Sequence, residues 1–201
     1  MRVFNNRNIE YTIQARETLR FISMHRLSNQ IRLLWQQYVY WTRMLILSIV
    51  FELPDLEFVT NRLLRNPRDF ADVLNLFYEE DVVSEFTKLL TQHIIIAAEF
   101  VKAAKDGDNA GVADAEKRWY ANADELAEFF RRINLFWPAV EWKKMLYDNI
   151  DMTKNEAIYM LNQRYEDSIN IFDAIEQQAL IMAETMTEGL IEFFPHILDK
   201  I

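Results

Sequence analysis

Cysteine is absent from this chain of 201 residues, and glycine and proline are scarce, with three and four residues respectively. The lack of cysteine excludes disulfides, thiolate metal ligands and cysteine nucleophiles, and it leaves the redox compartment open. Three glycines are too few for a glycine-rich phosphate loop, and neither a Gly-x-Ser-x-Gly elbow nor a paired-histidine zinc motif occurs. The scarcity of helix-breaking residues favours long helices. The sequence therefore predicts an all-α, non-enzymatic protein.

Long hydrophobic runs are also missing. The longest, Met44 to Phe51, ends at Glu52, far short of the roughly 20 apolar residues that span a bilayer. No apolar stretch typical of a signal peptide follows the first residues, Met1 to Asn8. We therefore expect a soluble, cytoplasmic protein with no membrane span.

Basic residues are outnumbered by acidic ones, 22 against 31, which gives a net charge of −9. The averaged field of such a chain repels nucleic acid and anionic membranes, so no nucleic-acid partner is expected. The first part of the chain is an exception, because arginines outnumber acids there: Arg2, Arg7, Arg16, Arg20, Arg26, Arg32 and Arg43. Their wide spacing is typical of solvated charges on helix surfaces, and an anion-binding face is the alternative.

A polar column, which we define as Tyr38, His93 and Asn149, recurs at intervals of 55 and 56 residues (93 − 38 and 149 − 93). The apolar positions around it recur too: Ile31, Phe86 and Trp142, then Trp35, Leu90 and Leu146. A second set, the amide column, recurs at intervals of 56 and consists of Asn66, Asn122 and Gln178. Such internal repetition predicts a triplicated helical hairpin. Independent amphipathic helices that share the same period are the alternative.

The expected organisation is a single domain, 1–201, with a leading helix at 9–27 and hairpin repeats at 28–76, 79–133 and 138–192. Ser28 or Asn29 is expected to cap the first arm, and the first hairpin to turn at Leu53-Pro54-Asp55, with Asp55 as the next cap. The return arm is expected to break at Asn66-Pro67, an N-cap followed by proline. Short turns predict antiparallel neighbours in an up-and-down helical bundle of three hairpins of about 56 residues, favoured over an open stack of helical pairs.

The remaining turns carry glycine or capping signals. Lys105 to Asn109 is expected to contain a turn in which Gly107 ends one helix and Asp108 or Asn109 begins the next. A connector, Asn134 to Pro138, leads into the third hairpin. Thr153 and Glu156 have capping-box spacing, which predicts a break at Thr153, whereas the repeat predicts a continuous helix to about Asn162.

Several stretches resemble a little-characterised bacterial family of all-helical proteins, from about Leu33 to Pro195. The resemblance is carried by Trp41-Thr42-Arg43, Leu53-Pro54-Asp55, Arg62 to Asn66, His93 through Ala104 to Asp108, Lys117 to Ala127, Met145-Leu146-Tyr147 and Phe194-Pro195. It implies an all-helical fold and no established function. The family pattern has histidine at all three positions of the polar column, and here only His93 keeps it.

Three interpretations of the two polar columns remain open. Buried polar groups that satisfy one another and hold helix register would explain them without a ligand. A pocket for a small polar ligand would use Arg43 as counter-charge, and a buried Arg43 would need a carboxylate such as Asp69, Glu99 or Glu125. A metal site would use His93 with Asp69 and Glu125. No Glu-x-x-His spacing occurs at any histidine, and one interior histidine is a thin ligand set.

The sequence therefore predicts a non-enzymatic structural or protein-interaction module, with no cofactor, that presents helix faces to a protein partner or to itself. The alternative is a bundle that binds a metal ion or a small polar ligand at the polar column around His93. Two sets of large side chains are expected to fill the core: the aromatic residues Phe129, Phe130, Phe136, Trp137 and Trp142, and the methionines Met145, Met152, Met160, Met182 and Met186.

Overall fold

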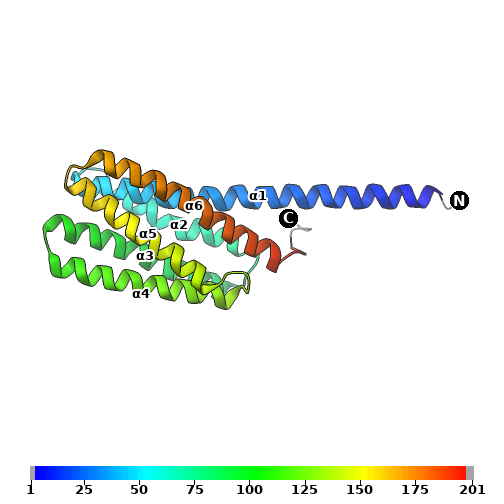
Figure 1. Ribbon diagram of the computed structural model, residues 1–201. Coiled ribbons are helices and arrows are strands. Elements are labelled where there is room, and N and C mark those ends of the chain that lie inside the picture. Colours follow the sequence, from blue (N-terminus) through cyan, green and yellow to red (C-terminus); the bar gives the residue numbers. More distant parts are fainter. Residues whose placement is uncertain (1–2, 198–201) are drawn as a thin grey trace.

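Six α-helices make up the described part of the chain, residues 3–197, in the computed structural model (Figure 1). Side chains are described from residue 17 onward. The helices are α1 (Val3–Val50), α2 (Leu56–Leu74), α3 (Glu80–Asp106), α4 (Asn109–Ile133), α5 (Ala139–Leu161) and α6 (Tyr165–Phe193). No strand occurs among these residues. The predicted all-α bundle is confirmed.

Helices that follow one another in the chain pack together, and α6 returns to pack against α1. Helices α1, α3 and α5 also contact one another, whereas in the described chain α2, α4 and α6 make no such mutual contacts. The first arms of the hairpins, α1, α3 and α5, are therefore inside. Each second arm, α2, α4 or α6, packs against two of these inner helices. Large aromatic side chains fill the interior and are fully buried, among them Trp119, Trp137 and Trp142. None of the described helices is long and apolar enough to cross a membrane.

Helix α1 is continuous from Val3 to Val50, so the prediction of a separate leading helix at 9–27 with a break at Ser28 or Asn29 is wrong. Serine and asparagine in a helix interior cost less than about 0.7 kcal/mol each relative to alanine, which is too little to end a helix by themselves. The buried face made by Leu27, Ile31 and Leu34 crosses the expected break without interruption. Tertiary packing therefore overrides the local capping signal.

The turn at residues 53–55 separates α1 from α2 as predicted, with Asp55 at the N-cap position. Its carboxylate does not cap α2, however, because it accepts a hydrogen bond from Ser48 Oγ at 2.8 Å. The predicted break at Asn66-Pro67 is wrong, since α2 runs through both residues. Asn66 Nδ2 donates across the bundle to the Leu34 carbonyl at 3.0 Å, and the Oδ1 that a cap would use accepts no hydrogen bond from a described residue.

The later turns follow their local signals. Gly107 ends α3 in the left-handed region, with φ of 70°. Asp108 then caps α4, because its Oδ1 accepts a hydrogen bond from the Gly111 amide at 3.0 Å. Helix α5 runs to Leu161, so the predicted continuity is confirmed and the break at Thr153 is wrong.

Candidate functional site

The polar column brings its three residues together in the middle of the bundle. Tyr38 on α1, His93 on α3 and Asn149 on α5 are all buried, and they line one internal cavity. The volume of the cavity is about 10 Å³, which is at the lower limit for a single water molecule. The polar column is thus a shared interior feature with almost no free space.

Both ring nitrogens of His93 have a partner. His93 Nδ1 lies 2.7 Å from Asn122 Oδ1, and Trp119 Nε1 donates to His93 Nε2 at 2.9 Å. Because Nε2 must accept from the indole N–H, the proton of the neutral imidazole is on Nδ1 and is donated to the amide oxygen. Burial lowers the pKa of His93 to about 4, and the bond to Asn122 opposes this only in part. At neutral pH the ring is uncharged and presents no free lone pair to a ligand.

The amide column makes the same contact three times. Asn66 Nδ2 donates to the Leu34 carbonyl at 3.0 Å, Asn122 Nδ2 to the Leu89 carbonyl at 3.1 Å, and Gln178 Nε2 to the Met145 carbonyl at 3.0 Å. Each accepting carbonyl lies four residues before the polar-column residue of its own hairpin (38 − 34, 93 − 89 and 149 − 145). Each second arm is therefore fixed to its first arm at an equivalent point.

Only the middle hairpin completes this arrangement. Asn66 Oδ1 and Gln178 Oε1, which correspond to the oxygen that binds His93, are buried without a hydrogen-bond partner among the described residues. Asn149 Nδ2 is unpartnered in the same way. In the first hairpin the residue equivalent to His93 is Tyr38, and burial raises the pKa of its hydroxyl, which stays protonated. Two hairpins thus retain the anchoring bond and lack the histidine bridge.

The predicted metal ligands do not meet. Asp69 is half-buried on α2 and forms ion pairs with Arg62 at 3.8 Å and Arg65 at 3.2 Å. Glu125 is exposed on α4, whereas His93 is in the interior. Across the residues that the structure describes, no three histidine or carboxylate side chains are grouped so that they could hold a metal ion.

Arg43 lies near the opposite end of α1 from the N-terminus, and its carboxylate partner is one that the sequence did not indicate. It pairs with the buried Glu156 of α5 rather than with Asp69, Glu99 or Glu125. The guanidinium also donates to the Ser168 carbonyl at 3.2 Å and lies 4.7 Å above the Phe172 ring of α6. Burial raises the pKa of Glu156 to about 7, although Arg43 acts to lower it.

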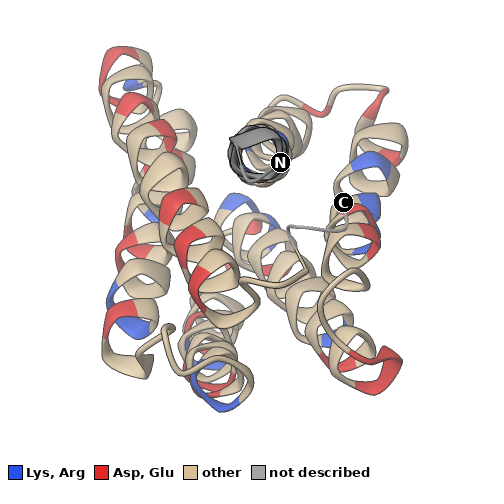
Figure 2. Cartoon of the chain, turned by 90° about the vertical axis from the view of Figure 1, so that its right-hand side faces the viewer, with Lys and Arg blue, Asp and Glu red and all other residues tan. Residues whose placement is uncertain are grey.

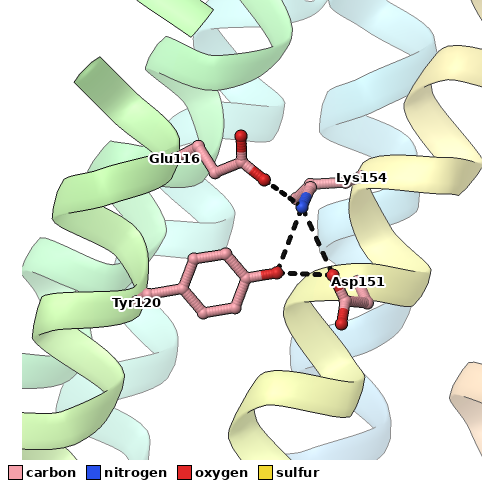
Figure 3. A network of polar contacts seen from close by, with 4 residues as sticks. All are labelled: Glu116, Tyr120, Asp151 and Lys154. Atoms are coloured by element: carbon pink, nitrogen blue, oxygen red, sulfur yellow. Dashed lines mark hydrogen bonds and ion pairs between the residues drawn. The ribbon is translucent and has the colours of Figure 1, made fainter. Parts of the chain in front are cut away.

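A polar network at the surface joins α4 to α5 and was not predicted from the sequence (Figure 3). Lys154 Nζ contacts Glu116, donates to the Tyr120 hydroxyl at 3.1 Å and lies 3.3 Å from Asp151 Oδ1. The Tyr120 hydroxyl donates to Asp151, and the Tyr120 ring packs edge-on against Tyr147 at 4.7 Å. Desolvation and the bond to Asp151 raise the pKa of Tyr120. The network ties two neighbouring helices together at a partly exposed position.

Comparison with known proteins finds no matching family model, no similar curated protein and no similar solved structure.

Proposed function

We propose that this protein is a non-enzymatic helical module that serves as a structural or protein-interaction element, and that its buried polar columns maintain the fold. The single observation that carries the proposal is the state of His93. Both of its ring nitrogens are engaged by Asn122 and Trp119, at 2.7 and 2.9 Å. A ligand at this histidine would have to break a buried hydrogen bond, which leaves a donor unsatisfied at a cost of about 1–3 kcal/mol.

The alternative is a metal ion or a small polar ligand at the polar column. The unpartnered Asn149 Nδ2 is the observation that favours it, because Asn149 lines the internal cavity. The cavity is only about 10 Å³, however, so any ligand larger than water would have to force the inner helices apart. The separation of Asp69 and Glu125 from His93 further weakens the case for a metal.

The cytoplasmic location and the bacterial family expected from the sequence are part of this proposal. The residue patterns described above support both, and both limit the proteins that could be partners of the module.

Native mass spectrometry and elemental analysis of the purified chain test the proposal. We expect the mass of the unmodified polypeptide and no stoichiometric metal. A His93→Ala variant is the matched comparison. A metal or small molecule present at one equivalent in the natural chain and absent from His93→Ala would contradict the proposal and establish the alternative.

A further inference from the structure

The internal cavity of the polar column is the size of one water molecule. It lies between the inner helices, where Trp35 and Tyr38 of α1, His93 of α3 and Asn149 of α5 line it. A buried water needs about 10 Å³ or more of free space, and the cavity has about 10 Å³. It can therefore hold one water molecule and has no room for a second guest or for a larger one.

Three buried polar groups on this lining have no hydrogen-bond partner in the described chain. Two of them are donors, Asn149 Nδ2 and Trp35 Nε1. The third is the Tyr38 hydroxyl, which is buried and makes no hydrogen bond, so that desolvation is the only cause of its raised pKa. His93 is different, because Asn122 and Trp119 engage both of its ring nitrogens. Buried polar groups without a protein partner are commonly satisfied by ordered water.

The chemistry of the lining favours a neutral hydrogen-bond acceptor over an ion. Charged residues are spread over the helices around α1 (Figure 2), but none of them lines the cavity. Among the described residues Glu156 is the only buried charged side chain, and it pairs with Arg43. The amide nitrogen of Asn149 and the indole nitrogen of Trp35 can only donate, so neither can bind a cation. An anion would be buried without a counter-charge, at a high desolvation cost.

We propose that one structural water molecule occupies this cavity and completes the polar column. The water oxygen accepts hydrogen bonds from Asn149 Nδ2 and Trp35 Nε1, and one water hydrogen is donated to the oxygen of Tyr38. Three hydrogen bonds are the usual number for a buried water. The water links α1 to α5, just as His93 links α3 to α4 through its direct bonds. Such a water is part of the folded protein and brings no metal or solute to the polar column. This inference rests on the proposed structural role of the polar column and specifies how the column is completed.

A high-resolution crystal structure of the full natural chain tests the position of the water. We expect one density peak in the cavity, within hydrogen-bond distance of Asn149 Nδ2, Trp35 Nε1 and the Tyr38 hydroxyl. A cavity without such a peak would overturn the inference. Asn149 would then be expected to donate directly to Gln178 Oε1, the unpartnered acceptor at the position equivalent to Asn122 Oδ1.

Oxygen-17 relaxation dispersion of water counts slowly exchanging water molecules in solution and gives an independent test. Asn149→Leu removes one donor and places a larger apolar side chain at the cavity. Its dispersion amplitude should therefore be lower than that of the natural chain by one water molecule. Thr187→Val is the matched control, because it removes a buried polar group that lies outside the cavity and bonds only within its own helix, to the Ala183 carbonyl. It should keep the full amplitude.

Circular dichroism checks that both variants fold, and the crystal structure needs no variant. An equal amplitude in the natural chain and Asn149→Leu would overturn the inference, as would the same loss in Thr187→Val. These failures are distinct from failure of the proposed function. A cavity without water in a metal-free protein refutes only the structural water, whereas a stoichiometric metal lost on His93→Ala refutes the proposed function whatever the cavity holds.

Discussion

The hydrogen bonds of His93 predict that Asn122 contributes more to stability than its counterpart Asn66. In Asn122→Ala, His93 Nδ1–H loses the acceptor that lies 2.7 Å away. Moving the proton to Nε2 gives no relief, because that nitrogen then faces the Trp119 N–H. At least one buried donor is left unsatisfied in either tautomer, at a cost of about 1–3 kcal/mol.

Asn122→Ala also removes the bond to the Leu89 carbonyl, which contributes about 1 kcal/mol. The free energy of unfolding should therefore fall by about 2–4 kcal/mol in total. Asn66→Ala is the matched control within the same chain. It loses only the bond to Leu34, and the Asn66 Oδ1 that it removes already has no partner. Its expected loss is about 1 kcal/mol or less.

Urea unfolding at pH 7, followed by circular dichroism, measures both variants by linear extrapolation. Unchanged m values would show that the two-state comparison holds. Equal losses in the two variants, or a larger loss for Asn66→Ala, would refute the reasoning that the histidine bridge makes the middle hairpin different. A double variant, His93→Leu/Asn122→Leu, should lose less than the sum of its single changes. The His93 N–H and the Asn122 Oδ1 are each left unpaired in one single variant and are both absent from the double variant, in which only the Trp119 N–H lacks its acceptor.

Four further predictions concern two buried titratable groups and two glycines. Since burial lowers the pKa of His93 to about 4, the free energy of unfolding should fall by about 3 kcal/mol as pH decreases from 6.5 to 4. The free energy of unfolding of His93→Gln should lack this dependence. Identical pH profiles of stability for the natural chain and His93→Gln would contradict the prediction. Burial raises the pKa of Glu156 to about 7. As pH rises from 4.5 to 7, the free energy of unfolding of the natural chain should therefore fall by up to about 3 kcal/mol relative to that of Glu156→Gln. If urea unfolding gives the same difference between the two proteins at both pH values, this prediction is wrong. In Gly189→Ala the new methyl would overlap the buried Trp137 indole, so the thermal midpoint should fall, corresponding to a loss of about 1–3 kcal/mol in the free energy of unfolding. A stabilised Gly189→Ala would contradict the predicted overlap. In Gly107→Ala the new methyl has open space, but the φ of 70° should cost about 1–2 kcal/mol of stability.

Turn positions could be predicted where the signal is local. The backbone at Gly107 adopts the left-handed region, which glycine enters without strain. Asp108 caps α4 by accepting a hydrogen bond from the backbone amide three residues later. The same logic was wrong at Ser28 and Asn66, because their environments are set by residues distant in sequence. The Asn66 side chain, for example, bonds to a carbonyl 32 residues away. Local capping chemistry is decisive only where tertiary contacts leave the side chain free.

The interior site was predicted in part. The spacing of the polar and amide columns identified residues that the structure places inside the bundle, because a period of 55 to 56 residues reflects equivalent positions in the three hairpins. The sequence did not indicate a role for Trp119, whose N–H completes the hydrogen bonds of His93. The Arg43–Glu156 pair joins residues 113 apart, and Glu156 was interpreted as a cap. Single-sequence periodicity indicates which side chains point inward and carries no information on which of them meet.

The protonation state of His93 tests the central claim, that the polar column maintains the fold and binds no ligand, most directly. Long-range proton–nitrogen spectra of the three histidines, recorded at pH 7 with and without added zinc, report the tautomer and any metal bond. We predict a neutral His93 with its proton on Nδ1 and ring nitrogen shifts that zinc does not change. A His93 Nε2 resonance that moves on addition of one equivalent of zinc, while His25 and His196 are unaffected, would contradict the account.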